Sequence, residues 1–164
     1  MKLLKDLLYD VRIEEVQGTT HIAVESISID SRVTKPMGLF VAIKGTQVDG
    51  HEYIAQAIVN GATTIVCELI PNNVEQLETT TFIKVKNSSE ALGHIAAAFY
   101  DHPTSEMKVV AVTGTNGKTT TISLLHSLFR IMDRKVGLVG TVENRINDKV
   151  VDSTHTTPDA ISLQ

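Results

Sequence analysis

The pattern of hydrophobic and polar positions along the chain predicts strands that alternate with helices. In the first hundred residues, one segment alternates with the period of two expected of a half-buried strand, and three others are short runs rich in apolar and β-branched residues. Other segments place apolar residues at helical spacing. The expected strands are 23–30, 39–45, 63–69 and 81–86, and the expected helices are 51–62 and 88–100. We therefore expect an α/β fold.

Local signals define the expected ends of these helices. Gly61 follows the last apolar positions of the first helix and is expected to end it. Asn87 and Glu90 have the spacing of a capping box, with Asn87 in the place of the usual Ser or Thr. The first ten residues also show helical spacing and predict an amphipathic helix. Its inward-facing residues are expected to be Leu3, Leu4, Leu7 and Leu8.

A polar, proline-containing stretch, residues 101–106, divides the pattern in two. We therefore expect two domains, 1–103 and 104–164. The second begins with a nearly continuous β-branched run at 107–114, as expected of a parallel strand buried on both faces.

The rest of the second domain shows four further signals. A helical pattern is followed by a second buried strand and then by a solvated hairpin or loop with Asn147 and Asp148 at its tip. Thr157 and Pro158 are expected to begin another helix, as its N-cap and its first residue. The first three segments are 119–132, 135–142 and 143–154.

The composition is that of an ordinary globular protein. Among 164 residues, 42% are hydrophobic and 21% charged, and the net charge of −4 gives no support for nucleic-acid binding. No apolar run approaches the roughly 18 residues needed to cross a membrane, and the N-terminus lacks the pattern of a signal peptide. We expect a soluble, cytoplasmic, monomeric protein without nucleic-acid or membrane partners. The single cysteine, Cys67, is expected to be a buried strand residue.

Residues 113–120, Thr-Gly-Thr-Asn-Gly-Lys-Thr-Thr, have the features of a phosphate-binding loop. Gly114 and Gly117 allow tight turns, so that backbone N–H groups surround a concavity at a helix N-terminus, where an anion is favoured. The Lys118 ammonium is able to reach terminal phosphate oxygens, and the Thr119 hydroxyl is placed to ligate Mg²⁺. The expected nucleotide-binding residues are Gly114, Thr115, Asn116, Gly117, Lys118, Thr119 and Thr120.

The loop departs from the usual phosphate-loop pattern, because Val112 stands where that pattern has its first glycine. The alternative is a glycine-rich turn between a strand and a helix, with a solvated lysine. A phosphate loop by itself also does not distinguish a kinase, a GTPase, a motor and a ligase.

This loop resembles the one shared by the Mur ligases of bacterial cell-wall synthesis; folylpolyglutamate synthetases are similar but usually have Gly-Ser after the lysine. Residues 29–62, with Asp-Ser-Arg, Gly-Leu-Phe-Val-Ala and Asp-Gly-His in that order, resemble the UDP-binding N-terminal domain of Mur ligases. Residues 154–164 resemble the threonine pair and helix of the family member that adds the third peptide residue. The resemblance covers nearly the whole chain. It implies a small mixed α/β UDP-binding domain followed by the start of a P-loop, parallel-sheet ATPase domain.

The resemblance also implies contacts with the uridine-nucleotide substrate. For Asp30-Ser31-Arg32 a side-chain-capped turn is the alternative, and for Thr156 and Thr157 plain N-capping of a helix is the alternative. The family often has Asn where His155 stands, and no chemistry is assigned to His51, His94 or His126. The substrate-binding residues implied are Ile29, Ser31, Thr46, Gln47, Val48, His155, Thr156 and Thr157.

The activity implied is ATP-dependent amide-bond formation through an acyl phosphate. The substrates are UDP-N-acetylmuramoyl-L-alanyl-D-glutamate and a diamino acid, either meso-diaminopimelate or L-lysine. ATP and Mg²⁺ are the cofactors, with Lys118 as the catalytic residue and Thr119 as the metal ligand. Other family machinery has no counterpart in these residues, so we expect the chain to be inactive alone. The alternatives are a non-catalytic nucleotide-binding module and a P-loop small-molecule kinase.

Overall fold

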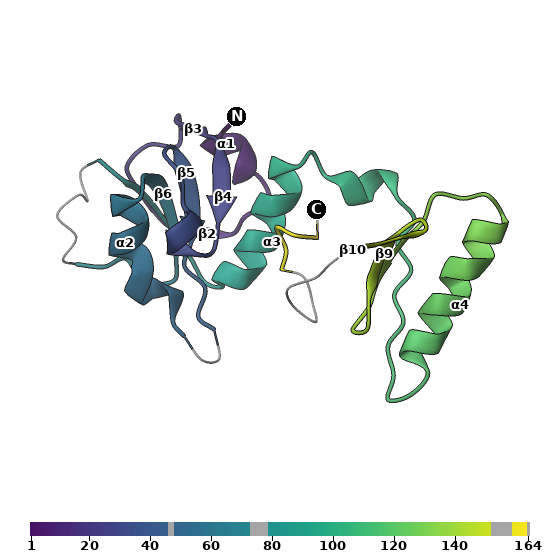
Figure 1. Cartoon of the computed structure of the whole chain (residues 1–164). Helices are drawn as coiled ribbons and strands as arrows, with labels where there is room; N and C mark the ends of the chain where they lie inside the picture. The colour runs from purple at the N-terminus through teal and green to yellow at the C-terminus, as the bar shows by residue number, and fades with distance from the viewer. Residues whose placement is uncertain (46–47, 73–78, 152–158, 164) are drawn as a thin grey trace. The chain divides into compact units, whose positions relative to one another are not determined.

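The computed structural model describes residues 1–45, 48–72, 79–151 and 159–163. These residues form two compact units, Met1–Glu106 and Met107–Leu163 (Figure 1). The first unit contains a mixed sheet with helices on both of its faces, which confirms the α/β class.

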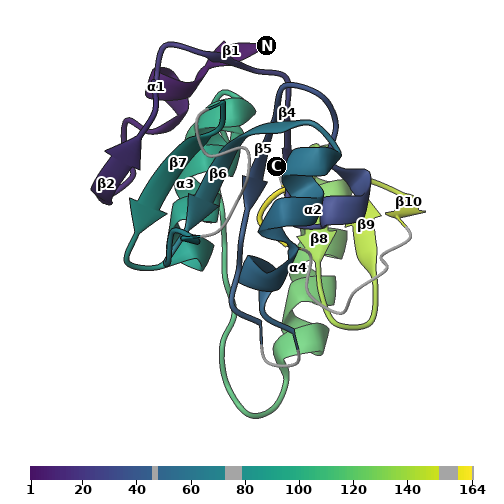
Figure 2. The same cartoon turned by 90° about the vertical axis from the view of Figure 1, so that its left-hand side faces the viewer.

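The first unit is built from short strands and helices in alternation (Figure 2). Its strands are β1 (Lys2–Leu3), β2 (Ile13–Gln17), β3 (Ala23–Val24), β4 (Ser26–Ser28), β5 (Gly38–Val41), β6 (Ala62–Cys67) and β7 (Thr81–Val85). Its α-helices are α1 (Leu4–Leu7), α2 (Ile54–Val59) and α3 (Ser88–Phe99), and its 3₁₀ helices are η1 (Ser31–Val33), η2 (Gly50–Tyr53) and η3 (Pro103–Glu106).

The main sheet has the strand order β2-β7-β6-β5-β4. Strands β4 to β7 are parallel, and β2 pairs antiparallel with β7 at one edge. The four expected strands are therefore present, but the first is divided. Ala23 and Val24 pair with β1 in a separate two-stranded sheet, whereas Ser26–Ser28 join the main sheet. The alternating pattern did not reveal this change of partner at Glu25, because both short strands keep the same periodicity.

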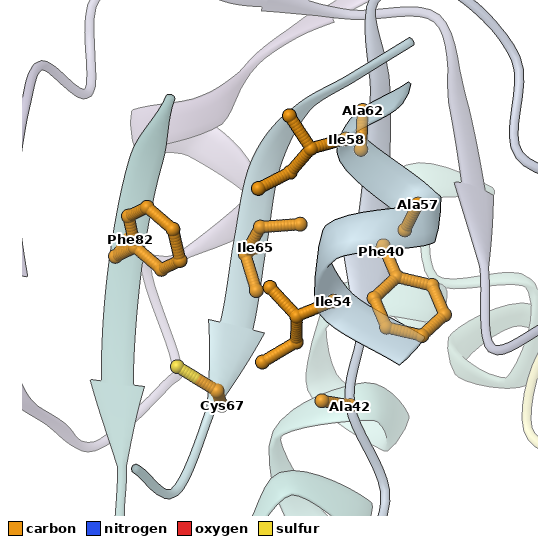
Figure 3. Close-up of a cluster of buried hydrophobic side chains, with 9 residues drawn as sticks. All are labelled: Phe40, Ala42, Ile54, Ala57, Ile58, Ala62, Ile65, Cys67 and Phe82. Atoms are coloured by element: carbon orange, nitrogen blue, oxygen red, sulfur yellow. The ribbon is translucent and has the colours of Figure 1, made fainter. Parts of the chain in front are cut away.

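The core lies on both faces of the parallel strands. Phe40, Ile65 and Phe82 point to one face, where α2 packs on them through Ile54 and other small or branched residues (Figure 3). The alternate positions of the same strands are also buried and point to the opposite face, which α1 and α3 cover (Figures 1 and 2). Burial on both faces explains why β5 to β7 are nearly continuous apolar runs. Cys67 is fully buried in β6, as predicted.

The predicted N-terminal helix is only partly correct. Leu4, Leu7 and Leu8 are buried, as expected, but the α-helix is limited to Leu4–Leu7. Leu3 belongs to β1 and is 40% exposed, so its expected inward orientation is wrong. Backbone pairing of Lys2 and Leu3 with β3 competes with the helix and takes these two residues from its first turn.

Both predicted helix-end signals of this unit are confirmed. The Asn87 side chain accepts a hydrogen bond from the Glu90 N–H at 3.0 Å and caps α3. Gly61 has a φ of +107° just after α2, a conformation that glycine adopts at little cost. The Gly61 N–H donates to the Ile58 carbonyl at 2.9 Å, which closes the last turn of the helix.

The second unit contains α4 (Lys118–Ile131) and the strands β8 (Gly137–Val139), β9 (Asn144–Ile146) and β10 (Lys149–Val151). The helix and the hairpin were predicted. Asn147 and Asp148 lie at the hairpin tip, where Asn147 has a φ of +53°. The Arg130 guanidinium of α4 holds the tip by a two-bond ion pair with Asp148, at 2.6 and 3.1 Å.

The buried parallel strand predicted at 107–114 is wrong. These residues form no described strand, and Val109 and Val110 are 70% and 64% exposed. The second strand prediction is only partly correct, because β8 covers three residues, of which Leu138 alone is buried. A parallel strand requires a hydrogen-bonded neighbour, and the described sheet of this unit, β10-β9-β8, is antiparallel.

Candidate functional site

The predicted phosphate loop connects the extended segment after Met107 to α4. Gly114 has a φ of +145° and Gly117 a φ of +79°, and Gly117 is the N-cap residue of α4. A Cβ atom at Gly117 would meet no heavy atom within 4 Å, so backbone conformation rather than space calls for glycine there. The two glycines thus bend the chain on either side of Thr115 and Asn116.

The Lys118 side chain folds back over this loop. Its Nζ donates to the Gly114 carbonyl at 2.5 Å and to the Thr115 carbonyl at 3.4 Å. Both contacts are exposed, so the ammonium can exchange them for an anion without uncovering a buried group. The Lys118 ammonium therefore connects the end of the loop to its beginning, and the same ammonium would attract a phosphate.

The start of α4 provides hydrogen-bond donors. Its first intrahelical bond runs from the Thr121 N–H to the Gly117 carbonyl at 2.9 Å, so the N–H groups of the three preceding helical residues have no acceptor within the helix. Gly117, the N-cap residue, provides no side-chain hydrogen bond to these N–H groups. Thr119 and Thr120 are exposed on this first turn. Free N–H groups, a positive helix end and a lysine suit an oxyanion of a phosphate.

The same residues fit a nucleotide–metal complex in one respect. The exposed Thr119 hydroxyl offers an oxygen ligand of the kind that Mg²⁺ prefers. Within the described ranges, no group of three or more His, Cys, Asp or Glu side chains is arranged to hold a metal ion.

The residues expected to bind the uridine nucleotide divide between described and undescribed parts of the chain. Thr46, Gln47, His155, Thr156 and Thr157 lie outside the described residues. The predicted N-cap at Thr157 is therefore also outside the described residues. Nearby, the Asp159 carboxylate accepts from the N–H groups of Ile161 and Ser162, both at 2.8 Å, and caps the turn that follows it.

The structure brings Ile29, Ser31 and Val48 to one edge of the main sheet. Ile29 and Ser31 follow β4, and Val48 lies in the segment that follows β5; β4 and β5 are parallel neighbours, so their carboxyl ends share an edge. Ser31 is only 4% exposed, whereas Val48 is 53% exposed and Ile29 is half-buried. The carboxyl edge of a parallel sheet is where ligands bind in open α/β folds.

The alternative interpretation of residues 30–32 is also present in the structure. The Asp30 carboxylate accepts from the Arg32 N–H at 2.9 Å and pairs with its guanidinium at 2.7 Å. The side-chain hydrogen bond from Arg32 is the main reason that the pKa of Asp30 lies below its usual value. The Asn60 amide donates to the Ser31 carbonyl at 2.7 Å and fixes this turn to the end of α2. A capped turn and a ligand-binding role are compatible here.

Two surface hollows lie away from these residues. One, of about 340 Å³, is lined largely by threonines, including Thr63, Thr80 and Thr81 near the amino ends of β6 and β7. The other, of about 350 Å³, lies beside Leu69 and Lys84. None of the expected site residues lines either hollow.

Sequence reasoning missed a polar network at this same edge. The His51 ring lies between the Asp49 carboxylate, 2.6 Å from Nδ1, and the Glu68 backbone N–H, 2.9 Å from Nε2. Glu68 falls within the apolar run 63–69 that predicts a strand. An acidic residue directly after the fully buried Cys67 was the available signal for it.

Comparisons with known proteins identify the family of both parts of the chain. The profile of the "Mur ligase family, catalytic domain" matches residues 23–100, and that of the "Mur ligase middle domain" matches residues 112–164. The chain belongs to the Mur ligase family. It is 53% identical over 160 residues to a Cytophaga hutchinsonii protein named UDP-N-acetylmuramoyl-L-alanyl-D-glutamate--2,6-diaminopimelate ligase. That match covers 98% of this chain and 33% of the relative, so this Mur ligase chain spans about a third of the curated relative's length.

Solved Mur ligases share its fold. A structure titled as a UDP-N-acetylmuramoyl-L-alanyl-D-glutamate--2,6-diaminopimelate ligase aligns over 99% of this chain and 32% of its own, with a TM-score of 0.73 at 20% identity. The MurF ligase of Thermotoga maritima, solved in complex with ADP, aligns over 68% of this chain and 24% of its own, with a TM-score of 0.51 at 29% identity. No helix in the described part of this Mur ligase chain is long and apolar enough to span a membrane.

Proposed function

We propose that the protein to which this chain belongs is an ATP-dependent amide-bond ligase of peptidoglycan synthesis. It joins a diamino acid to the D-glutamate of UDP-N-acetylmuramoyl-L-alanyl-D-glutamate. The observation that carries this proposal is the 53% identity, over 98% of the chain, to a ligase named for that reaction. The name of this relative favours 2,6-diaminopimelate over lysine as the diamino acid.

In this proposal residues 104–164 bind ATP through the phosphate loop. Lys118 leaves the carbonyls of Gly114 and Thr115 and donates to the terminal phosphates, and the first-turn N–H groups of α4 bind their oxygens. When bound, Mg²⁺ on the Thr119 hydroxyl neutralises phosphate charge. Phosphoryl transfer depends mainly on position and charge, so these residues act by holding rather than by covalent chemistry. The Thermotoga maritima relative was solved in complex with ADP, which supports adenine-nucleotide binding by the protein.

Residues 1–103 bind the uridine end of the other substrate in this proposal. Ile29, Ser31 and Val48 lie at the carboxyl edge of the sheet, and the proposed site extends to Thr46 and Gln47. The reacting D-glutamate carboxylate lies at the opposite end of that molecule. Binding energy gained at the uridine thus fixes a distant carboxylate for reaction. His155, Thr156 and Thr157 are proposed to bind the muramoyl part.

Calorimetric titration of the chain tests the proposal. We expect one-to-one binding of UDP-N-acetylmuramoyl-L-alanyl-D-glutamate and, separately, of ATP with Mg²⁺. Folate is the control ligand, because folate-adding ligases have a similar phosphate loop. Binding of folate without binding of the uridine nucleotide would contradict the proposal, and binding of ATP alone would favour a small-molecule kinase.

A further inference from the structure

Four residues form a continuous hydrogen-bonded network along the carboxyl edge of the main sheet, and we name it the edge network: Asp49, His51, Glu68 and Ser88. Asp49 Oδ1 lies 2.6 Å from His51 Nδ1 and accepts from the His51 N–H at 3.0 Å. His51 Nε2 accepts from the Glu68 N–H at 2.9 Å. Both nitrogens of the imidazole therefore have partners.

The network continues into α3. Glu68 Oε1 accepts from the N–H and from the hydroxyl of Ser88, both at 3.0 Å. Ser88 is the first residue of α3 and is fully buried. His51 thus connects the segment after β5, through the end of β6, to the start of a core helix.

These contacts select one form of the imidazole. A backbone N–H only donates, so Nε2 must carry a lone pair toward Glu68, and the single ring proton of the neutral form then lies on Nδ1, facing Asp49. A proton on Nε2 would face the Glu68 N–H and break that bond. The network is complete only while His51 is neutral.

The segment that His51 holds consists of two hydrogen-bonded stretches, residues 43–45 and 48–50, which together we call the base. The Gly45 N–H donates to the Val48 carbonyl at 3.0 Å, and the Gly50 N–H donates to the Ile43 carbonyl at 2.8 Å. A Cβ atom at Gly50 would lie 2.8 Å from backbone atoms of Ile43, so the two arms of this base are in close contact. The base is therefore stiff within itself, and its attachment to the sheet depends on the residues that follow it.

We propose that His51 is a positioning residue that fixes this base, and with it Val48, against the sheet edge in the arrangement that binds the uridine nucleotide. The inference rests on the proposed function. The His51 side chain is 16% exposed and that of Asp49 37%. The charged groups around His51 are the carboxylate of Asp49, the ammonium of Lys44 and, on β6, the carboxylate of Glu68, which Ser88 occupies.

The Asp49 carboxylate does not change its charge near neutral pH. The hydrogen bond from the His51 N–H holds the pKa of Asp49 below its usual value, so this carboxylate stays ionised near neutral pH. Histidine gains its proton between about pH 8 and about pH 5. A second ring proton, on Nε2, would face the Glu68 N–H and break that bond, so nucleotide affinity is expected to be lower wherever the ring carries both protons.

The test measures binding of UDP-N-acetylglucosamine by calorimetry at about pH 8 and about pH 5.5. This probe carries the uridine, and its phosphates are diesters that do not titrate in that range. We expect the affinity of the unmodified chain to fall about fivefold or more at the lower pH, the effect of one hydrogen bond. His51→Phe, which keeps a ring but no nitrogen, should bind weakly at both pH values.

Two further variants separate positioning from general loss of structure. His51→Gln places an amide oxygen toward the Glu68 N–H, so it should keep most of the affinity at about pH 8 and lose the pH dependence. His94→Gln alters an exposed histidine of α3 and should behave as the unmodified chain does. Unchanged affinity in His51→Phe, or an unchanged pH profile in His51→Gln, would overturn the inference.

The test distinguishes failure of the His51 inference from failure of the proposed function. If the unmodified chain does not bind the probe at either pH, the proposed uridine site fails. The amide NMR signal of Glu68 then decides the edge network alone. That signal should shift between about pH 8 and about pH 5.5 in the unmodified chain and stay constant in His51→Gln; a signal that moves equally in both contradicts the network.

Discussion

At the scale of single residues, Gly117 and Gly93 show that the effect of replacing a glycine depends on its backbone conformation. A Cβ atom would meet nothing within 4 Å at either position, but Gly117 has a φ of +79° at the start of α4, whereas Gly93 lies inside α3. An L-residue pays about 1–2 kcal/mol in the left-handed region, whereas alanine stabilises a helix interior by about 0.5–1 kcal/mol relative to glycine. The same substitution should therefore have opposite effects.

We expect Gly117→Ala to destabilise the first turn of α4 and Gly93→Ala to stabilise α3. Amide hydrogen exchange, followed in each helix separately, measures both effects. Exchange in the first turn of α4 should become faster in Gly117→Ala, and exchange in α3 should become slower in Gly93→Ala. Equal changes of the same sign would show that the loop does not depend on the conformation of Gly117.

Lys118 is the residue on which ATP binding is expected to depend most. A hydrogen bond to a charged group is worth about 1.5–3 kcal/mol, so Lys118→Ala should weaken ATP binding by about 10- to 150-fold. Lys135→Ala, an exposed lysine beyond the other end of α4, is the matched control and should leave binding unchanged. Calorimetry with ATP and Mg²⁺ measures both, and equal affinities for the two variants would remove Lys118 from the site.

Cys67 should be unreactive in the folded chain. Burial raises the pKa of its thiol to about 12, so the folded state holds this proton where an unfolded thiol, with a pKa of about 8.5, has lost it. This stabilising contribution is present below about pH 8.5 and is lost as the pH rises toward about 12. At about pH 9, a disulfide reagent should label the thiol only after urea unfolds the chain. Immediate labelling without urea would contradict the buried position.

At the scale of elements, the sequence predicted best where a local signal and the tertiary contacts agree. Asn87 caps α3, Gly61 ends α2, and Asn147 and Asp148 form a hairpin tip, because each of these depends on neighbours within a few residues. Strand partners depend on distant residues. The alternating pattern at 23–30 therefore predicted one strand where the structure has two, in two different sheets. The run at 107–114 has no strand partner among the described residues.

The Asn87 cap offers a direct test at this scale. Asn87→Ala removes the acceptor for the Glu90 N–H and should lower the free energy of unfolding by about 1 kcal/mol. Asn87→Ser keeps a capping oxygen and should cost much less. Urea unfolding monitored by circular dichroism compares the two, and equal midpoints for Asn87→Ala and Asn87→Ser would show that α3 does not need this cap.

At the scale of the whole molecule, the two units differ in how completely their apolar surface is covered. The first unit buries Phe40, Phe82 and the other large apolar side chains of its parallel strands, whereas Val109, Val110 and Ile131 of the second unit are 64–84% exposed. The chain spans about a third of its curated relative. The motif at 113–120 could be identified from sequence because its residues are contiguous, but the edge network could not, because His51 and Glu68 meet only through the fold.

The central claim is that the phosphate loop binds ATP and the carboxyl edge of the first unit binds the uridine nucleotide. Amide NMR spectra of the labelled chain, titrated with each ligand separately, test it most directly. We predict that ATP with Mg²⁺ shifts signals of residues 113–121 and that UDP-N-acetylmuramoyl-L-alanyl-D-glutamate shifts signals of residues 29–31 and 48–51. Shifts from both ligands in one unit, or none in these segments at saturating concentrations, would contradict the account.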